Sequence, residues 1–144
     1  MVGSAGKEEE EYEKMIRQIP EDEDLKNVIF TGFTDEPQKY MSVFDILAFP
    51  SHDESFGRVL VEAMAMGIPT ASSGFAGVLD ITVENETGLL FEPKNPVSMA
   101  EALSKLISDS DLRHKFSVNG KKRFQEYFTL DKVTKSLLNL YYNT

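Results

Sequence analysis

The sequence predicts an α/β protein in which helices cover both faces of a doubly wound parallel sheet. Strand-like and helix-like segments alternate along the chain, as they do where helices connect the strands of a parallel sheet. The strand-like segments are short apolar runs that end at glycine or proline. The length of 144 residues, with 41% hydrophobic and 27% charged residues, fits one globular domain over 1–144.

The first half of the chain is expected to contribute two helices and two strands. A Glu-rich helix is expected at about 7–18, and its acidic face is most simply a solvated surface. A short buried strand is expected at 27–31, and a helical pattern at about 35–43. The apolar run 45–49 predicts a second strand, which ends because Pro50 cannot continue it.

A well-bounded helix and two further strands follow. Helical spacing covers 58–66, where Gly67 is expected to cap the C-terminus and Pro69 prevents continuation. The remaining elements before the C-terminal helices are a strand at 70–73, a short turn or helix at 77–83, and a strand at 88–91.

The remainder, about 96–142, is expected to be helical. Asn95 is placed as an N-cap with Pro96 at the first helical position. A last helix is expected from about Leu130, after Thr129 as its cap. Apolar positions along these helices are expected to pack in the core, and they are Met99, Leu103, Leu106, Leu112, Phe116, Phe124, Tyr127, Phe128, Val133, Leu137, Leu140 and Tyr141.

Composition excludes several classes of function. The absence of cysteine excludes disulfides, thiolate metal sites and cysteine nucleophiles, and two histidines, His52 and His114, do not make a His-rich metal centre. The net charge of −9 argues against a nucleic-acid partner. The first residues lack the pattern of a signal peptide, and the sequence contains no run of about 18 apolar residues. We therefore expect no transmembrane segment and a cytoplasmic protein, peripheral to a membrane at most.

The loop 50–57 is the expected position of a ligand site. It follows a strand, and ligands of doubly wound sheets bind beyond the carboxyl ends of the strands. Gly57 allows the backbone to approach a ligand, and the N–H groups of the helix that follows can face a phosphate group. Glu54 in this loop and Glu62 in the helix suit a ligand that carries hydroxyl groups at both ends.

Plain alternatives exist for each of these residues. Glu54 could be a loop acid in water, and Glu62 could form an exposed ion pair with Arg58, one turn earlier in the helix. His52 could orient a substrate or simply satisfy a loop carbonyl.

The segment 50–69, PSHDESFGRVLVEAMAMGIP, resembles the Glu-x7-Glu signature of retaining glycosyltransferases related to glycogen synthase and sucrose synthase, the family 4 group with the GT-B fold. The flanking segments 27–34 (NVIFTGFT) and 87–93 (TGLLFEP) resemble the family in the same order. The resemblance covers nearly the whole chain. It implies a partial C-terminal domain of Rossmann-like fold that binds a nucleotide-diphosphate sugar.

The resemblance also implies roles for single residues. Glu62 would bind the ribose hydroxyls, and the catalytic Glu54 would face the hydroxyls of the transferred sugar. The other donor-binding residues implied are His52, Ser55, Phe56, Gly57, Arg58, Val59 and Leu60. The reaction would retain the anomeric configuration, and positive groups and the helix dipole would stabilise the leaving diphosphate without a required metal or other cofactor. The donor could be a UDP-, GDP- or ADP-sugar, and the acceptor a saccharide or lipid glycan.

The sequence departs from the family in two places. It is expected to lack the N-terminal domain and also the first strand and helix of the donor domain. The segment that carries an Arg and a Lys gripping the diphosphate is lost with that strand and helix, so we expect weak donor binding and no transfer by this chain alone. An exposed sheet edge predicts self-association or pairing with another chain. The segment 74–80, GFAGVLD, stands where many relatives have paired glycines followed by Pro-Glu, with Asp80 in place of the Glu. A non-catalytic nucleotide-binding or assembly module derived from such an enzyme is therefore the alternative.

Overall fold

The structure is a computed structural model that describes residues 1–3, 10–51 and 53–142. The chain forms two compact units, Met1–Tyr40 and Met41–Thr144, and each is described by itself. Helix α1 (Glu10–Asp22) belongs to the first unit, and the short helix α2 (Pro37–Met41) lies at the junction between the two. Helix α2 begins at proline, whose fixed φ suits the first helical position.

The first unit contains less regular structure than the sequence predicts. The predicted helix 7–18 is present from Glu10 and continues to Asp22, while its first three positions lie outside the described residues. The predicted strand at 27–31 is wrong, because no residue of this segment belongs to a strand. Gly32, directly after this segment, forms an isolated bridge with Gly3, and the Thr31 N–H donates to the Met1 carbonyl at 3.1 Å. A strand needs a partner along its length, and no strand among the described residues pairs with this segment.

The second unit is built on a parallel sheet of three strands, β1 (Leu47–Phe49), β2 (Thr70–Ser73) and β3 (Gly88–Phe91). Both pairs are parallel, and the strands lie in the order β1-β2-β3. The predicted strands 70–73 and 88–91 are confirmed at their bounds, whereas β1 begins two residues later than the predicted run at 45. The sequence order of the strands is therefore also their order in space.

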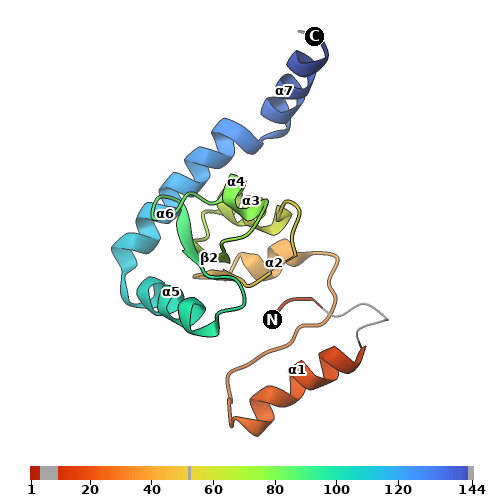
Figure 1. The fold of residues 1–144 in the computed structure, drawn as a ribbon, viewed down its shortest axis with the longest axis vertical. Helices are drawn as coiled ribbons and strands as arrows, with labels where there is room; N and C mark the ends of the chain where they lie inside the picture. The colour runs from red at the N-terminus through yellow and green to blue at the C-terminus, as the bar shows by residue number, and fades with distance from the viewer. Residues whose placement is uncertain (4–9, 52, 143–144) are drawn as a thin grey trace. The chain divides into compact units, whose positions relative to one another are not determined.

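Helices cover both faces of this sheet, as predicted (Figure 1). The helices of the second unit after α2 are α3 (Arg58–Met66), α4 (Val78–Ile81), α5 (Pro96–Ser108), α6 (Ser110–Arg123), the π-helical segment η2 (Phe124–Phe128) and α7 (Leu130–Tyr142). Alternation along β3 decides which helices meet which face, since successive side chains point to opposite sides. Leu89 and Phe91 pack with α5 and α6, whereas Leu90 packs with α3 and α4.

Helix termini follow the predicted capping residues. Asn95 accepts hydrogen bonds through its side chain from the N–H groups of Val97 and Ser98, with Pro96 at the first position of α5. Gly67 ends α3 in the left-handed conformation, with φ 75° and ψ 32°. Only glycine adopts this conformation without steric cost, which is why a glycine at position 67 predicts the end of the helix.

Helix α6 holds the end of α4 and the connection from α4 to β3 through side chains spaced four residues apart. Lys115 Nζ and Asn119 Nδ2 donate to the carbonyls of Asn85 and Glu86, each at 2.9 Å. Arg123 donates from Nε to the Ile81 carbonyl at 2.8 Å and from Nη2 to the Asp80 carbonyl at 2.7 Å. Residues four apart lie on one face of a helix, so one face of α6 satisfies the carbonyls of this connection.

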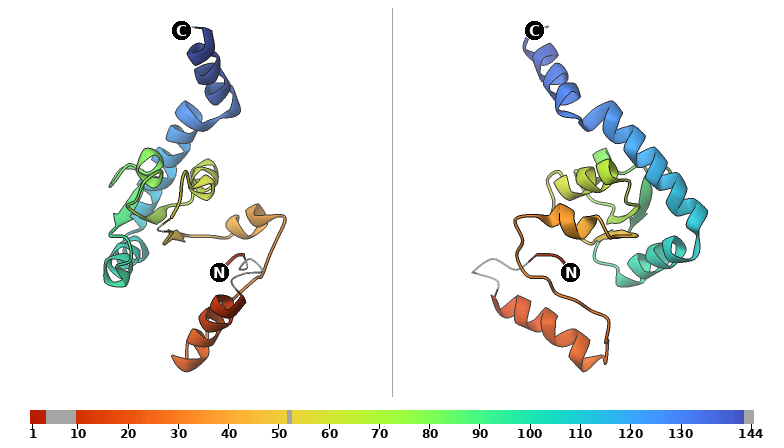
Figure 2. Two further views of the ribbon diagram at one scale, coloured as in Figure 1. Left: turned by 45° about the vertical axis from the view of Figure 1, so that its right-hand side comes forward. Right: turned by 180° about the vertical axis from the view of Figure 1, so that it is seen from behind.

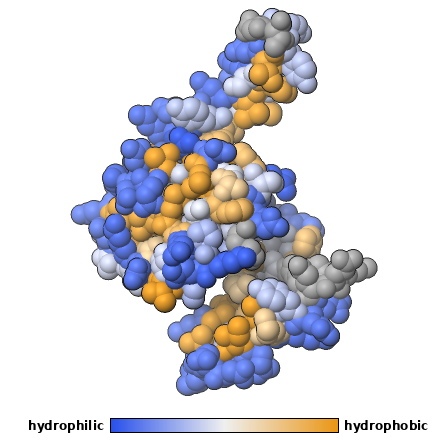
Figure 3. All heavy atoms as spheres, viewed as in Figure 1, coloured by the Kyte–Doolittle hydropathy of each residue, from blue (hydrophilic) through white to orange (hydrophobic). Residues whose placement is uncertain are grey.

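The C-terminal part differs from the prediction in two respects. The π-helical turns of η2, which were not predicted, continue α6 before α7 begins a new segment (Figure 2). The expected core positions of α7 are also wrong. Among the described residues α7 buries none, and its apolar side chains remain on the surface (Figure 3). No helix among the described residues combines the length and the apolar character that crossing a membrane requires.

Candidate functional site

The loop between β1 and α3 lies where the sheet topology places a ligand site. All three strands are parallel, so their carboxyl ends, at Phe49, Ser73 and Phe91, share one edge of the sheet. The loop starts at Pro50, directly after β1, and ends at Gly57. Ligands of open α/β sheets bind at such an edge. His52 was predicted to contribute here, but it lies outside the described residues.

Gly57 makes the turn from this loop into α3. Its φ of 81° and ψ of 54° are left-handed, which disfavours any residue with a Cβ. It is also the N-cap of α3, and its carbonyl accepts the N–H of Leu60 at 2.9 Å. A glycine cap provides no side-chain acceptor for the first N–H groups of the helix, so these donors face the loop side without competition from the cap.

Glu54 is partly buried and held by its own loop. Its Oε1 accepts a hydrogen bond from the Phe56 N–H at 3.3 Å, across two residues. This contact orients the carboxylate but uses only one of its acceptor sites, since an ionised carboxylate can accept about four hydrogen bonds. Glu54 therefore retains acceptor capacity for a ligand.

The predicted residues of this loop line one surface pocket. Its volume is about 400 Å³, and its walls are formed by Glu54, Ser55, Phe56, Arg58 and Val59. An acid, a base and an aromatic ring thus converge on one space at the carboxyl end of β1. A polar ligand with both hydroxyl and anionic groups fits this chemistry.

Gly57, Leu60 and Glu62 were also predicted for the site, and they do not line this pocket. Leu60 has no exposed surface and packs with Met64 in the core, and its predicted donor contact stays a prediction. Glu62 is exposed on α3, and the ion pair with Arg58 that was the alternative explanation for it is not formed between these two described residues. The Glu62 carboxylate therefore remains available.

The structure adds a residue that the sequence analysis did not assign to the site. Gly77 lies against the loop so closely that a Cβ at this position would stand 2.1 Å from the Ser55 carbonyl oxygen. The glycine pair at 74 and 77 was noticed only as a departure from the family pattern. The close approach itself has no sequence signal, because it depends on how α4 packs against the loop.

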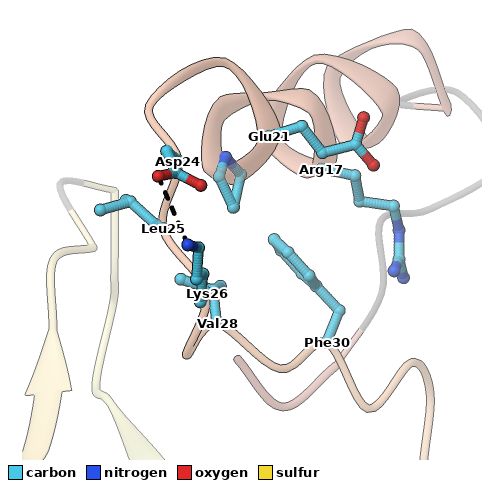
Figure 4. A pocket seen from close by; sticks show the side chains of 8 residues that line it. Arg17, Glu21, Asp24, Leu25, Lys26, Val28 and Phe30 are labelled. Carbon is cyan, nitrogen blue, oxygen red and sulfur yellow. Dashed lines mark ion pairs between the residues drawn. The ribbon is translucent and has the colours of Figure 1, made fainter.

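A second pocket lies in the first unit and carries charges of both signs (Figure 4). The Arg17 guanidinium lies 4.9 Å from the centre of the Phe30 ring and donates to Glu13 Oε1. Lys26 Nζ lies 3.7 Å from a carboxylate oxygen of Asp24. Both bases already have acidic partners, so this pocket has no uncommitted positive group for an anionic ligand.

No group of three or more His, Cys, Asp or Glu side chains is arranged to hold a metal ion in the part of the chain that the structure describes.

The parallel sheet with helices on both faces defines a Rossmann-like α/β domain. Within this class the chain belongs to the glycosyl transferases group 1, whose family model matches residues 1–123. The chain is 31% identical over 115 residues to the capsular polysaccharide biosynthesis glycosyltransferase CapM of Staphylococcus aureus, an alignment that covers 80% of this chain and 30% of CapM.

Solved structures agree with this assignment. HepE of Anabaena in complex with UDP superposes with a TM-score of 0.93 at 26% identity, covering 99% of this chain and 40% of HepE. The C-terminal domain of the group 1 glycosyl transferase LpcC of Francisella tularensis superposes with a TM-score of 0.82 at 32% identity, covering 90% of this chain and 69% of that domain. The predicted fold and the resemblance to a partial C-terminal GT-B domain are thus confirmed. The chain spans about 30% of the length of the first curated relatives that it matches.

Proposed function

We propose that this chain is the donor-binding part of a retaining glycosyltransferase, which transfers a sugar from a nucleotide-diphosphate sugar to a saccharide or lipid glycan. The supporting observation is the pocket at the carboxyl end of β1, where Glu54, Ser55, Phe56, Arg58 and Val59 converge. HepE, a member of the same structural group, has been solved with UDP and with UDP-glucose.

Glu54 is assigned to the transferred sugar. Its partly buried carboxylate is oriented by the Phe56 N–H and keeps free acceptor sites, which suits paired sugar hydroxyls. The backbone of Ser55, Phe56 and Gly57 would contact the same sugar. We therefore assign Glu54 as the catalytic carboxylate.

The diphosphate is assigned to the start of α3. The N-terminus of a helix carries about half a positive elementary charge, and its first N–H groups point toward an anion. Arg58 lines the same pocket and adds a full positive charge. This local positive potential opposes the net charge of −9 and would stabilise the leaving diphosphate without a resident metal.

Glu62 is assigned to the ribose hydroxyls of the nucleotide. It lies one turn after Arg58 on α3 and is exposed without an ion pair to that residue. A ribose bound here would place the nucleotide along α3 and the sugar over Glu54. Glu62 and Glu54 would then bind the ribose and the sugar, at the two ends of one donor molecule.

Calorimetric titration of the chain with UDP, GDP and ADP, and with their glucose or mannose conjugates, tests this function. Glu62→Ala should abolish binding of both the nucleotide and the sugar nucleotide. Glu54→Ala should retain the nucleotide and lose only the additional affinity for the sugar conjugate. Glu101→Ala, an exposed glutamate of α5, is the matched control and should bind as wild type does.

Transfer itself is tested in a longer protein that contains this chain and spans the full length of its glycosyltransferase relatives. Such a protein should release nucleoside diphosphate from its donor with retention of configuration, and Glu54→Ala should lose this activity. Full activity of Glu54→Ala would refute the site assignment. A protein of that length that binds no nucleotide would instead favour the non-catalytic assembly module.

A further inference from the structure

The π-helical segment η2 contacts the loop that carries Glu54. The rings of Phe56 and Phe128 meet edge to face, with centroids 6.4 Å apart and an angle of 67° between the ring planes. Phe56 is 44% exposed, so this contact is made by a side chain that is otherwise largely open to solvent. The Phe56 N–H in turn donates to Glu54 Oε1. A line of contacts therefore runs from Phe128 through Phe56 to Glu54.

The η2 segment is itself fixed in place. Arg123, directly before it, donates two hydrogen bonds to the carbonyls of Asp80 and Ile81 at the end of α4. The same guanidinium lies 5.1 Å from the ring centre of Tyr127 and 5.8 Å from that of Phe128. The Arg123 guanidinium, which is hydrogen-bonded to the end of α4, thus packs on the Phe128 ring and stabilises its position.

Phe128 differs in this respect from its neighbour Phe124. Both are partly buried and pack on the same core cluster of Leu60, Met64, Val78 and Ile81. Of the two, only Phe128 has a ring contact with Phe56 among the described residues. Phe124 therefore shares the structural role of Phe128 but not its link to the loop. π-Helical turns are rare and occur frequently at functional sites.

We infer that Phe128 is a positioning residue for the donor sugar, an inference that rests on the function proposed above. Its ring fixes Phe56, and the Phe56 backbone orients the Glu54 carboxylate toward the sugar hydroxyls. Binding of the nucleotide alone, at Glu62 and the start of α3, does not depend on this contact. Phe128 therefore affects recognition of the sugar rather than recognition of the nucleotide.

Hydrogen exchange and calorimetry on the full chain test this inference. Phe128→Leu should accelerate amide exchange at Ser55 and Phe56 and weaken binding of the sugar nucleotide about three- to tenfold, the range that one edge-to-face aromatic pair supports. Affinity for the nucleoside diphosphate should stay at the wild-type value. Phe124→Leu, the matched control, should leave both measurements unchanged, and Phe128→Tyr, which keeps the ring, should restore them.

The exchange measurement separates this inference from the proposed function. If the wild-type chain binds no nucleotide sugar, the proposed function fails, yet exchange at Ser55 and Phe56 still reports whether Phe128 holds the loop. Equal exchange in Phe128→Leu and wild type overturns the inference, as does an equal effect of Phe124→Leu. If Phe128→Leu does not fold, Phe56→Leu removes the same ring contact from the exposed side, and wild-type exchange in that variant also overturns the inference.

Discussion

Gly77 touches Ser55 so closely that the loop bearing Glu54 has no room to move toward α4. A Cβ at Gly77 would lie 2.1 Å from the Ser55 carbonyl oxygen and 2.9 Å from the Phe56 Cα. The backbone at Gly77 is ordinary right-handed helix, with φ −58° and ψ −17°, so a side chain is excluded by space and not by conformation. The loop is therefore bounded by a backbone contact at Gly77 and by an aromatic contact at Phe128.

Gly77→Ala should displace this loop and destabilise the domain. Both contacting atoms belong to the backbone and cannot rotate away, so we expect a loss of about 1–3 kcal/mol in the free energy of unfolding. Urea unfolding measures this loss, and calorimetry should show weaker binding of the sugar nucleotide. Gly74→Ala is the matched control, because its Cβ would meet nothing closer than 3.5 Å. Equal stability of the two variants would contradict the steric argument.

Arg123 should contribute to stability more than its exposed neighbour Lys122. Its guanidinium donates to two backbone carbonyls, of Asp80 and Ile81, which lose their partner on substitution. We expect Arg123→Ala to lower the free energy of unfolding by about 1.5–3 kcal/mol. Lys122→Ala should change it by less than about 0.5 kcal/mol. Arg123→Lys should recover only part of the loss, because an ammonium does not reproduce the planar fork.

Local signals on the sequence predicted the second unit well. β2, α3 and β3 occur at their predicted bounds, because each lies between residues that act locally, such as Gly57, Gly67 and Pro69. The proximity of Glu54, Arg58 and Val59 followed from the loop and helix start alone, and the pocket joins them. Local conformation and strand–helix alternation therefore carried most of the fold and the centre of the candidate site.

The errors concern features that depend on partners distant in the sequence. The segment 27–31 has the apolar pattern of a strand, but the described residues offer it one bridge at Gly32 and no neighbouring strand. The apolar residues of α7 have the spacing of one helix face, but this spacing does not determine whether another element packs on that face. The contact of Gly77 with Ser55 likewise depends on tertiary packing, which no local pattern encodes.

Burial distinguishes Leu137 from Leu106, although both lie on apolar helical stripes. Leu106 of α5 has no exposed surface, whereas Leu137 of α7 is 53% exposed. Leu106→Ala should therefore cost about 2–5 kcal/mol in the free energy of unfolding, through lost burial and a cavity. Leu137→Ala should cost less than about 0.5 kcal/mol. A large loss for Leu137→Ala in urea unfolding of the monomer would mean that α7 packs against the domain.

Glu84 should limit self-association at one edge of the sheet. β3 is an edge strand, and the N–H of its Leu90 donates to Glu84 Oε2 instead of to another strand. Glu84→Ala leaves this N–H without its partner, and unpaired groups along an edge strand are a template for pairing with another chain. Sedimentation velocity over a concentration series should then show more dimer and larger species than wild type.

Glu84→Gln provides the matched control, because its amide oxygen still accepts the Leu90 N–H while the negative charge is lost. If charge repulsion limits self-association, Glu84→Gln should associate as Glu84→Ala does, since both variants reduce the net charge of −9 by one. If the hydrogen bond at the edge is the cause, Glu84→Gln should sediment as wild type does. We expect Glu84→Gln to sediment as wild type does, because the loss of one charge of nine changes the net repulsion little. The Leu90 N–H at the β3 edge, in contrast, depends on one specific acceptor, the side chain at position 84.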